Sequence, residues 1–229
     1  MTLAYLIIYL GDYMKKLVIF GFDGTIADTS PGILYCFNTT ASAMGYQPID
    51  HEALYGVIGI PLEDGFRILF NMKEDEIEYA ANNYSKLYSQ KGKEMFSLYP
   101  GIKNTLKRLK ENGCKTAIAT QKHIMFTSDM LEVHGISDLF DAVCATDVNT
   151  NLNKSDLILQ ACHATNVDRA DAIFIGDSSV DAIGAQNAGI DFAAALYGWG
   201  FKTKEDIEQY NCKLYFNSAE EIYLKLSLL

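Results

Sequence analysis

Apolar residues in the first hundred positions change from a strand-like run to helical spacing. Leu17–Phe20 is an uncharged run of aliphatic and aromatic residues, which is typical of a buried parallel strand. From about residue 30 to residue 96, apolar residues recur at every third or fourth position instead, as Ile33, Phe37 and Ala41 do. The pattern therefore predicts one buried strand followed by a group of helices.

After a hinge predicted at Tyr99-Pro100-Gly101, strand-like apolar runs alternate with helical segments, which indicates parallel βαβ units. Predicted helices cover residues 102–112, 123–134, 154–166 and 178–188, and predicted strands cover residues 115–120, 142–145, 172–175, 192–196 and 213–216. A last helix is expected to open with a capping box at Ser218-Ala219-Glu220-Glu221. The predicted fold is α/β, a doubly wound Rossmann-like parallel sheet with a small α-helical cap inserted after the first strand.

The predicted organisation is an α/β core domain of residues 14–29 and 97–229, with a helical cap domain at residues 30–96. Residues 1–13 form an N-terminal extension whose apolar run is much shorter than the ~20 residues of a membrane span. Met14-Lys15-Lys16 directly before the first strand looks like a natural start. The extension then has three interpretations: a misassigned or vestigial start, an additional packed strand or helix, or a targeting segment.

The amino-acid composition and the net charge limit the kinds of molecule that this protein is expected to bind. The chain has 229 residues, of which 49% are hydrophobic and 21% charged, as is ordinary for a soluble globular protein. Its formal net charge of -10 argues against binding to nucleic acid or to an acidic membrane, although a small anionic ligand remains compatible with a local basic pocket. Five cysteines without a C-x-x-C pair predict buried reduced thiols in a cytoplasmic protein. We expect a monomer or a homodimer.

The end of the first strand carries the first candidate chemistry. In an open α/β sheet, ligands bind just beyond the carboxyl ends of the strands. Here the strand is followed by Gly21-Phe22-Asp23-Gly24-Thr25. Asp23 and Thr25 are therefore expected where the chemistry takes place.

Three further motifs follow along the chain. Thr120 ends a predicted strand and precedes Gln121-Lys122, and its hydroxyl can donate to a phosphoryl oxygen without adding negative charge. Lys154 opens a helix, where a cation opposes the helix dipole and so is not placed for helix stability. Asp177 ends a buried strand and Asp181 lies one helical turn further, so both can converge on one cation. Taken singly, each also fits an ordinary structural role: a turn residue, a solvated lysine or a helix N-cap.

Taken in order, these motifs resemble those of the haloacid dehalogenase superfamily. Asp-Gly-Thr after the first strand, a threonine after the second, a lysine and then Gly-Asp-x-x-x-Asp is that family's order of four motifs, and the resemblance covers the chain from Met14 onward. Residues 58–67 and 196–200 are similar to the phosphoglycolate-phosphatase-like branch, which has a cap after the first motif. The resemblance implies a Mg²⁺-dependent phosphatase whose partner is a small phosphorylated metabolite: phosphoglycolate, a sugar phosphate or a nucleotide monophosphate.

The resemblance also implies roles for individual residues. Asp23 would be the acid/base and would give its backbone carbonyl to the metal, while Asp177 would be a metal ligand with Asp181 supporting it directly or through water. Arg67 and Lys122 are candidate cationic contacts to the substrate. The residues implied to hold the phosphoryl group are Gly24, Thr25, Thr120, Gln121 and Lys154.

Gly21 departs from the family pattern, because the family carries its nucleophilic aspartate at this position. Glycine offers neither a nucleophile nor a metal ligand; losing a nucleophile can lower the rate by a factor on the order of 10⁶, and Mg²⁺ binding is expected to weaken as well. Three accounts are open: an introduced or inadvertent change in a normal phosphatase, a natural pseudoenzyme that binds a phosphorylated ligand or partner, or a natural enzyme with slow, water-dependent hydrolysis. The other motifs are intact, which favours the first account.

Overall fold

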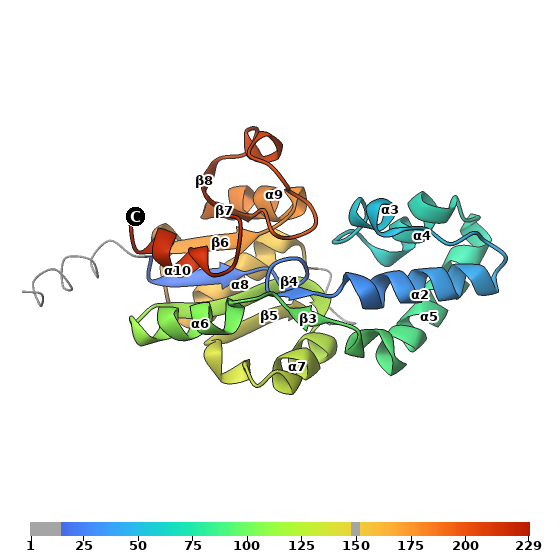
Figure 1. Cartoon of the computed structure of the whole chain (residues 1–229), viewed down its shortest axis with the longest axis horizontal. Helices are drawn as coiled ribbons and strands as arrows, with labels where there is room; N and C mark the ends of the chain where they lie inside the picture. Colours follow the sequence, from blue (N-terminus) through green and yellow to red (C-terminus); the bar gives the residue numbers. More distant parts are fainter. Residues whose placement is uncertain (1–14, 148–151) are drawn as a thin grey trace, which may run out of the picture. The chain divides into compact units, whose positions relative to one another are not determined.

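A computed structural model describes residues 15–147 and 152–229 of the chain. The chain divides into two compact units, an α/β unit formed by Met1–Ala27 and Leu98–Leu229 and a helical unit formed by Asp28–Ser97 (Figure 1). The N-terminal extension predicted at residues 1–13 lies outside the described residues.

Six parallel strands form the central sheet of the α/β unit, in the order β5-β4-β1-β6-β7-β8. Their bounds are β1 (Leu17–Phe20), β4 (Lys115–His123), β5 (Ala142–Thr146), β6 (Ala172–Gly176), β7 (Asp191–Ala195) and β8 (Cys212–Phe216). A separate two-stranded sheet pairs β2 (Ala27–Asp28) with β3 (Ser97–Leu98). The chain runs outward from β1 to one edge and then from β6 to the other, so the predicted doubly wound parallel sheet is confirmed.

Helices lie on both faces of this sheet (Figure 1). They are α6 (Ile102–Glu111), α7 (Ile124–Val133), α8 (Lys154–Thr165), α9 (Ser179–Ala188) and α10 (Glu221–Leu226), with short 3₁₀ turns η2 (Ser137–Leu139), η3 (Arg169–Asp171) and η4 (Glu205–Ile207). Helix α8 contacts α9 and β4, whereas α6 contacts α10 and β4. The predicted alternation of strands and helices is therefore confirmed.

Alternate residues of the central strands build the core beneath α8 and α9. Leu17 and Ile19 of β1 pack there with Phe174 of β6 and Leu157 of α8, and all four are fully buried. The intervening residues Val18 and Phe20 are equally buried on the opposite face, because successive side chains of a strand point to opposite sides. Burial on both faces explains why β1 is an unbroken apolar run.

The start of the last helix differs from the prediction. Helix α10 begins at Glu221 with Glu220 as its N-cap residue, and no side chain caps it. The Glu221 carboxylate accepts a hydrogen bond from the backbone N–H of Asn217 at 3.0 Å and pairs with Lys225 Nζ at 2.7 Å. The predicted capping box at residues 218–221 is therefore wrong, because the glutamate binds a lysine one turn further along its own helix.

The helical unit contains α2 (Ser30–Ala43), α3 (His51–Tyr55), α4 (Leu62–Phe70), α5 (Glu74–Gln90) and the turn η1 (Gly92–Glu94). Its helices meet around Phe37, whose ring centroid lies 4.8 Å from the centroids of both Phe66 and Tyr84. The helical spacing of apolar residues between 30 and 96 thus places aromatic rings in one cluster. None of the described helices is long and apolar enough to cross a membrane.

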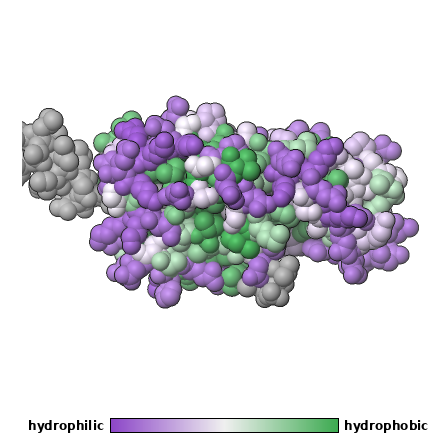
Figure 2. Space-filling model, turned by 90° about the horizontal axis from the view of Figure 1, so that it is seen from below, coloured by the Kyte–Doolittle hydropathy of each residue, from purple (hydrophilic) through white to green (hydrophobic). Residues whose placement is uncertain are grey.

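On the face of the molecule shown in Figure 2, hydrophilic side chains surround a smaller area where hydrophobic side chains reach the surface. Large apolar residues with exposed side chains are Ile68, Tyr79, Met125, Val133, Ile183, Leu224, Leu228 and Leu229. These exposed positions provide matched controls for substitutions in the core.

Replacing Ile19 with alanine is expected to lower the free energy of unfolding by about 2–5 kcal/mol, because the side chain is fully buried between β1 and α8/α9. The control Val133→Ala removes a side chain that is 76% exposed and should change the value by at most about 0.5 kcal/mol. Urea unfolding followed by circular dichroism measures both. Equal effects of the two substitutions would contradict the described core.

Candidate functional site

The predicted motifs lie close together because they follow the carboxyl ends of the neighbouring parallel strands β1, β4 and β6. Phe20 of β1 is level with Ile118 of β4 and with Ile175 of β6. Two residues beyond these partners, Thr120 lies on β4 and Asp177 directly follows β6, and these two strands flank β1. The strands that follow β1 in the chain lie on one side of it, and those from β6 onward lie on the other side. Open α/β sheets bind ligands at the point where the strand order reverses in this way.

The turn after β1 is held by its own backbone. The amides of residues 25–27 all donate to the carbonyl oxygen of Phe22, at 2.9 to 3.3 Å, and the amide of Gly24 donates to that of Ala27 at 2.9 Å. Gly24 has φ +74°, a left-handed conformation that favours glycine. A Cβ atom at Gly24 would also collide with the carboxylate of Asp177, so this turn and Asp177 touch only because residue 24 has no side chain.

Gly21 occupies a position that a larger residue can also adopt. Its amide donates to the carbonyl oxygen of Ile175 at 2.8 Å, which continues the register of β1 with β6. Its φ lies outside the left-handed region. A Cβ atom at residue 21 would lie 3.1 Å from Thr25 Oγ1 and 3.7 Å from the Ile175 carbonyl oxygen. The backbone therefore admits a Cβ atom here, since only the Thr25 hydroxyl has to give way slightly.

Thr25 presents a buried hydroxyl next to that position. Its side chain is 0% exposed, and Oγ1 has no hydrogen-bond partner among the described residues. The backbone carbonyl of Thr25 accepts from the Tyr197 hydroxyl at 2.8 Å, which fixes the turn in place. Leaving a hydroxyl unpaired in the protein interior costs about 1–3 kcal/mol. The site thus holds an unsatisfied donor beside Gly21.

Asp177 is the most deeply buried acid of the site. Its side chain is 4% exposed, and its Oδ2 accepts backbone hydrogen bonds from Trp199 at 2.9 Å and from Gly200 at 3.2 Å. Burial, together with the neighbouring Asp181 carboxylate, raises the pKa of Asp177 to about 7. Sequence reasoning assigned no role to these two donors; the Gly198-x-Gly200 pattern after a strand was the available signal.

Asp181 is held by protein donors on both of its oxygens. Oδ2 accepts from the Ser178 hydroxyl at 2.8 Å and from the amides of Asp177 and Ser178 at 3.1 Å each, as part of a capping box at the start of α9. Oδ1 pairs with Lys154 Nζ at 3.0 Å. Both side chains are largely buried, at 6% and 11% exposure, so Lys154 is not a solvated surface lysine. Asp181 therefore joins the two helices that flank the site.

Lys122 forms a second, partly buried pair, with Asp23. Strand β4 runs on to His123, beyond its predicted end at residue 120, and carries Lys122 Nζ to 2.9 Å from Asp23 Oδ1. Lys122 is 6% exposed, and its amide donates to the Thr120 hydroxyl at 3.1 Å. The predicted acid/base, the predicted phosphoryl-binding threonine and Lys122 are thus linked by direct contacts.

Two other predicted residues lie in different surroundings. Gln121 is exposed, and its backbone carbonyl accepts from the Thr146 hydroxyl at 2.7 Å. Arg67 belongs to the helical unit, where it pairs with Asp64 and, at 3.0 Å, with Glu74. These carboxylates raise the pKa of the Arg67 guanidinium above its ordinary value, chiefly through the hydrogen bond to Glu74.

The acids of the site have the chemistry of a magnesium site but not its full ligand set. Among residues 15–147 and 152–229, no group of three or more His, Cys, Asp or Glu side chains is placed to hold a metal ion. Asp23 and Asp181 are paired with lysines, whereas Asp177 is a buried carboxylate beside a second one, a setting that a hard cation relieves. Gly21 adds no carboxylate to this arrangement.

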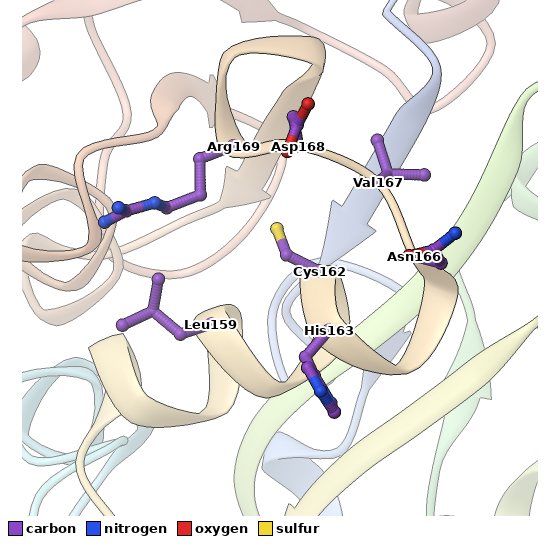
Figure 3. A pocket seen from close by; sticks show the side chains of 7 residues that line it. All are labelled: Leu159, Cys162, His163, Asn166, Val167, Asp168 and Arg169. Carbon is purple, nitrogen blue, oxygen red and sulfur yellow. The ribbon is translucent and has the colours of Figure 1, made fainter.

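A surface pocket of about 500 Å³ lies away from this group (Figure 3). It is lined by Leu159, Cys162, His163, Asn166, Val167, Asp168 and Arg169. Helix α8 starts with Lys154 at the site and ends at Thr165, whose carbonyl accepts from Lys115 at the start of β4. The pocket is therefore near the amino-terminal ends of the strands, and none of the predicted site residues lines it.

Comparison with known proteins places this geometry in a family. The model of a family described as haloacid dehalogenase-like hydrolase matches residues 18–195. The chain is similar to a phosphoglycolate phosphatase of Psychrobacter arcticus, with 29% identity over 86% of this chain and 89% of that protein. It is 30% identical to one of Rhodobacter capsulatus, over 90% of this chain and 95% of that protein. A solved haloacid dehalogenase-like hydrolase of Streptococcus pneumoniae superposes with a TM-score of 0.85 at 28% identity, covering 93% of this chain and 99% of that one.

Replacing Gly198 with alanine is expected to lower the free energy of unfolding by about 1–3 kcal/mol. The added Cβ would lie 2.3 Å from both the Gly24 carbonyl oxygen and Asp177 Cβ, and the first of these is a backbone atom. The control Gly21→Ala meets only a hydroxyl and should change the value by at most about 1 kcal/mol. Urea unfolding compares the two variants, and a larger loss for Gly21→Ala would contradict the described packing.

The raised pKa of Asp177 predicts a pH dependence of stability in metal-free buffer. Because the folded-state pKa of about 7 lies above the unfolded-state value, the folded protein binds the extra proton between them. The free energy of unfolding should therefore fall as pH rises from about 4 to about 7. Asp177→Asn should remove this part of the slope.

The matched control is Asp206→Asn at an exposed site. Hydrogen bonds from the backbone amides of Lys202 and Thr203 lower the pKa of Asp206, so this acid stabilises the folded state above its unfolded-state pKa. Its replacement should alter the acid limb of the stability profile with the opposite sign. Unchanged slopes in the Asp177→Asn protein would show that the buried carboxylate titrates normally.

Proposed function

This chain belongs to the haloacid dehalogenase-like hydrolase family, and from that premise we propose that its site is built to act on a small phosphomonoester. The names of its relatives support a phosphatase of the phosphoglycolate phosphatase type. Phosphoglycolate, a sugar phosphate and a nucleotide monophosphate are the candidate substrates. The observation that carries the proposal is the pair of buried lysine–aspartate contacts at the carboxyl ends of the strands, Lys122–Asp23 and Lys154–Asp181.

In this proposal the phosphoryl group is bound by Thr120 and Lys154. Both side chains are largely buried, where electrostatic attraction to a phosphate is less screened than in water. The amides of Gly24 and Thr25 already donate within their own turn, so they are not assigned to the phosphoryl group. Gly24 contributes by letting the backbone of the turn approach closely, and Thr25 contributes its hydroxyl. The lysine ammonium offsets the negative charge of the phosphoryl group, and the hydroxyls donate hydrogen bonds to it without adding negative charge.

Asp23 acts in this proposal as the acid that gives a proton to the leaving oxygen. Lys122 orients the Asp23 carboxylate through their 2.9 Å contact. Phosphatases of this family generally use Mg²⁺; we assign its binding to the Asp177 carboxylate and the Asp23 backbone carbonyl, where it would neutralise phosphoryl charge when bound. Trp199 and Gly200 hold the Asp177 carboxylate through their amides.

Gly21 sets the expected activity of this chain. The resemblance places the nucleophilic aspartate at this position, and glycine has no side chain to attack phosphorus. The proposed consequence is a protein that binds a phosphomonoester and hydrolyses it very slowly. A protein that only binds a phosphorylated ligand or partner is the second candidate, favoured by the same residue. The two differ in whether an aspartate at position 21 restores turnover.

Gly21→Asp is expected to raise phosphomonoesterase activity strongly, up to a factor on the order of 10⁶. The backbone at residue 21 admits a Cβ atom, and the other groups of the site are in place. The measurement is release of inorganic phosphate from a panel of phosphomonoesters in the presence of Mg²⁺. Phosphoglycolate, sugar phosphates and nucleotide monophosphates form the panel.

The matched control is Gly21→Asn, which has the same shape as aspartate but no carboxylate nucleophile, and it should stay as inactive as the unchanged chain. Inactivity of all three proteins, together with thermal stabilisation by one phosphomonoester, would favour the binding protein. Equal activity of the unchanged chain and the Gly21→Asp variant would contradict the role assigned to this position.

A further inference from the structure

We propose that this chain associates with a second copy of itself, and that the basic and apolar face formed by α6 and α10 of one copy binds the acidic face at the start of α5 of the other. The α6/α10 face belongs to the α/β unit and the α5 face to the helical unit. Neither face contains a residue of the proposed phosphatase site. Association of this kind is therefore independent of the proposed hydrolysis.

Helix α6 carries a row of exposed lysines. Lys103, Lys107 and Lys110 follow one another at four and three residues, which places them on one side of the helix. Lys103 and Lys110 donate to the backbone carbonyls of His134 and Asp138, at 3.1 and 2.6 Å, and none of the three lysines forms an ion pair with a described residue. In a chain with 29 acidic and 19 basic residues, this row is a local excess of positive charge that attracts an anionic partner.

Exposed leucines of α10 and of the residues after it extend the same face. Helix α6 packs against α10 (Figure 1), and the Arg108 guanidinium lies 4.0 Å from the centroid of the Tyr223 ring, so the exposed sides of the two helices are adjacent. Leu224 is 58% exposed and Leu228 is 75% exposed. Exposed apolar side chains beside charged ones are typical of surfaces that bind another protein.

The start of α5 has the opposite charge. Four of its first five residues are acidic. Asp75 and Glu78 are both exposed, and neither forms an ion pair with a described residue. They are three residues apart and so lie on one side of the helix, and Tyr79 beside them is 64% exposed. This face therefore combines unpaired carboxylates with an exposed ring, which complements the lysines and leucines of the α6/α10 face.

Charge complementarity favours a second copy over other anionic partners. Two copies with a net charge of -10 each repel one another at long range, but this repulsion is screened beyond about 8 Å at physiological ionic strength. Opposite charges that become partly buried in an interface are screened much less. A nucleic acid or an acidic membrane is anionic over its whole surface and offers no exposed ring to cover the leucines. The start of α5 offers both.

Sedimentation velocity of the unchanged chain, from micromolar to millimolar concentration at physiological ionic strength, measures this association. Lys107→Glu and Glu78→Lys are each expected to raise the dissociation constant by a factor on the order of ten, because attraction across the interface becomes repulsion. An equimolar mixture of these two variants should regain association, because each substituted residue then meets the opposite charge. Leu228→Ser should also weaken association. The control Lys91→Glu changes the net charge equally at the far end of α5 and should leave association unchanged.

A monomer even at millimolar concentration would overturn the proposal. Association that any one of Lys107→Glu, Glu78→Lys and Leu228→Ser leaves unchanged would also overturn it, as would a mixture of the two charge variants that does not recover association. All three substitutions replace exposed side chains, and circular dichroism checks that each variant is folded. Because sedimentation needs no substrate, its outcome is independent of the phosphate-release assay of the Gly21→Asp protein.

Discussion

The burial of the Asp177 carboxylate at the carboxyl edge of a parallel sheet is the constraint on which the site depends. A buried acid needs donors close to it, and here two amides from the segment after β7 supply them. That segment approaches closely only because Gly198 has no side chain, and the turn after β1 approaches from the other side because Gly24 has none. Three segments that are distant in sequence thus meet around one carboxylate.

Charge pairing completes the arrangement. Lys122 and Lys154 are both nearly inaccessible to solvent, and each contacts one aspartate. Removing one partner from such a pair leaves an uncompensated buried charge, which is strongly unfavourable. The two pairs therefore keep two cations and two acids near the strand ends without leaving any of the four charges isolated. Gly21 lies among these groups and adds no charge of its own.

The structure separates two properties of residue 21. Its backbone has ordinary geometry and would accept a side chain, so the fold does not require glycine there. The chemistry of the family resemblance, in contrast, requires a carboxylate at this position. The Thr25 hydroxyl beside it has no hydrogen-bond partner among the described residues. The fold therefore does not require a glycine at position 21, and the effect on the reaction is part of the proposed function.

The sequence by itself determined the strands of the six-stranded sheet, most helices and the order of the motifs, but not the short strands β2 and β3. Apolar spacing is a local property, and it placed β1 at Leu17–Phe20 as observed. Only the tertiary structure decided which side chains meet. Lys122 and Asp23 are 99 residues apart, and the amide of Trp199 reaches Asp177 across 22 residues. No local pattern encodes such contacts, because they arise from strand register and from the close approach of glycines. The wrong capping box at residues 218–221 has a local reason instead: helix α10 begins at Glu221 with no side-chain cap, and Glu221 pairs with Lys225 four residues further along.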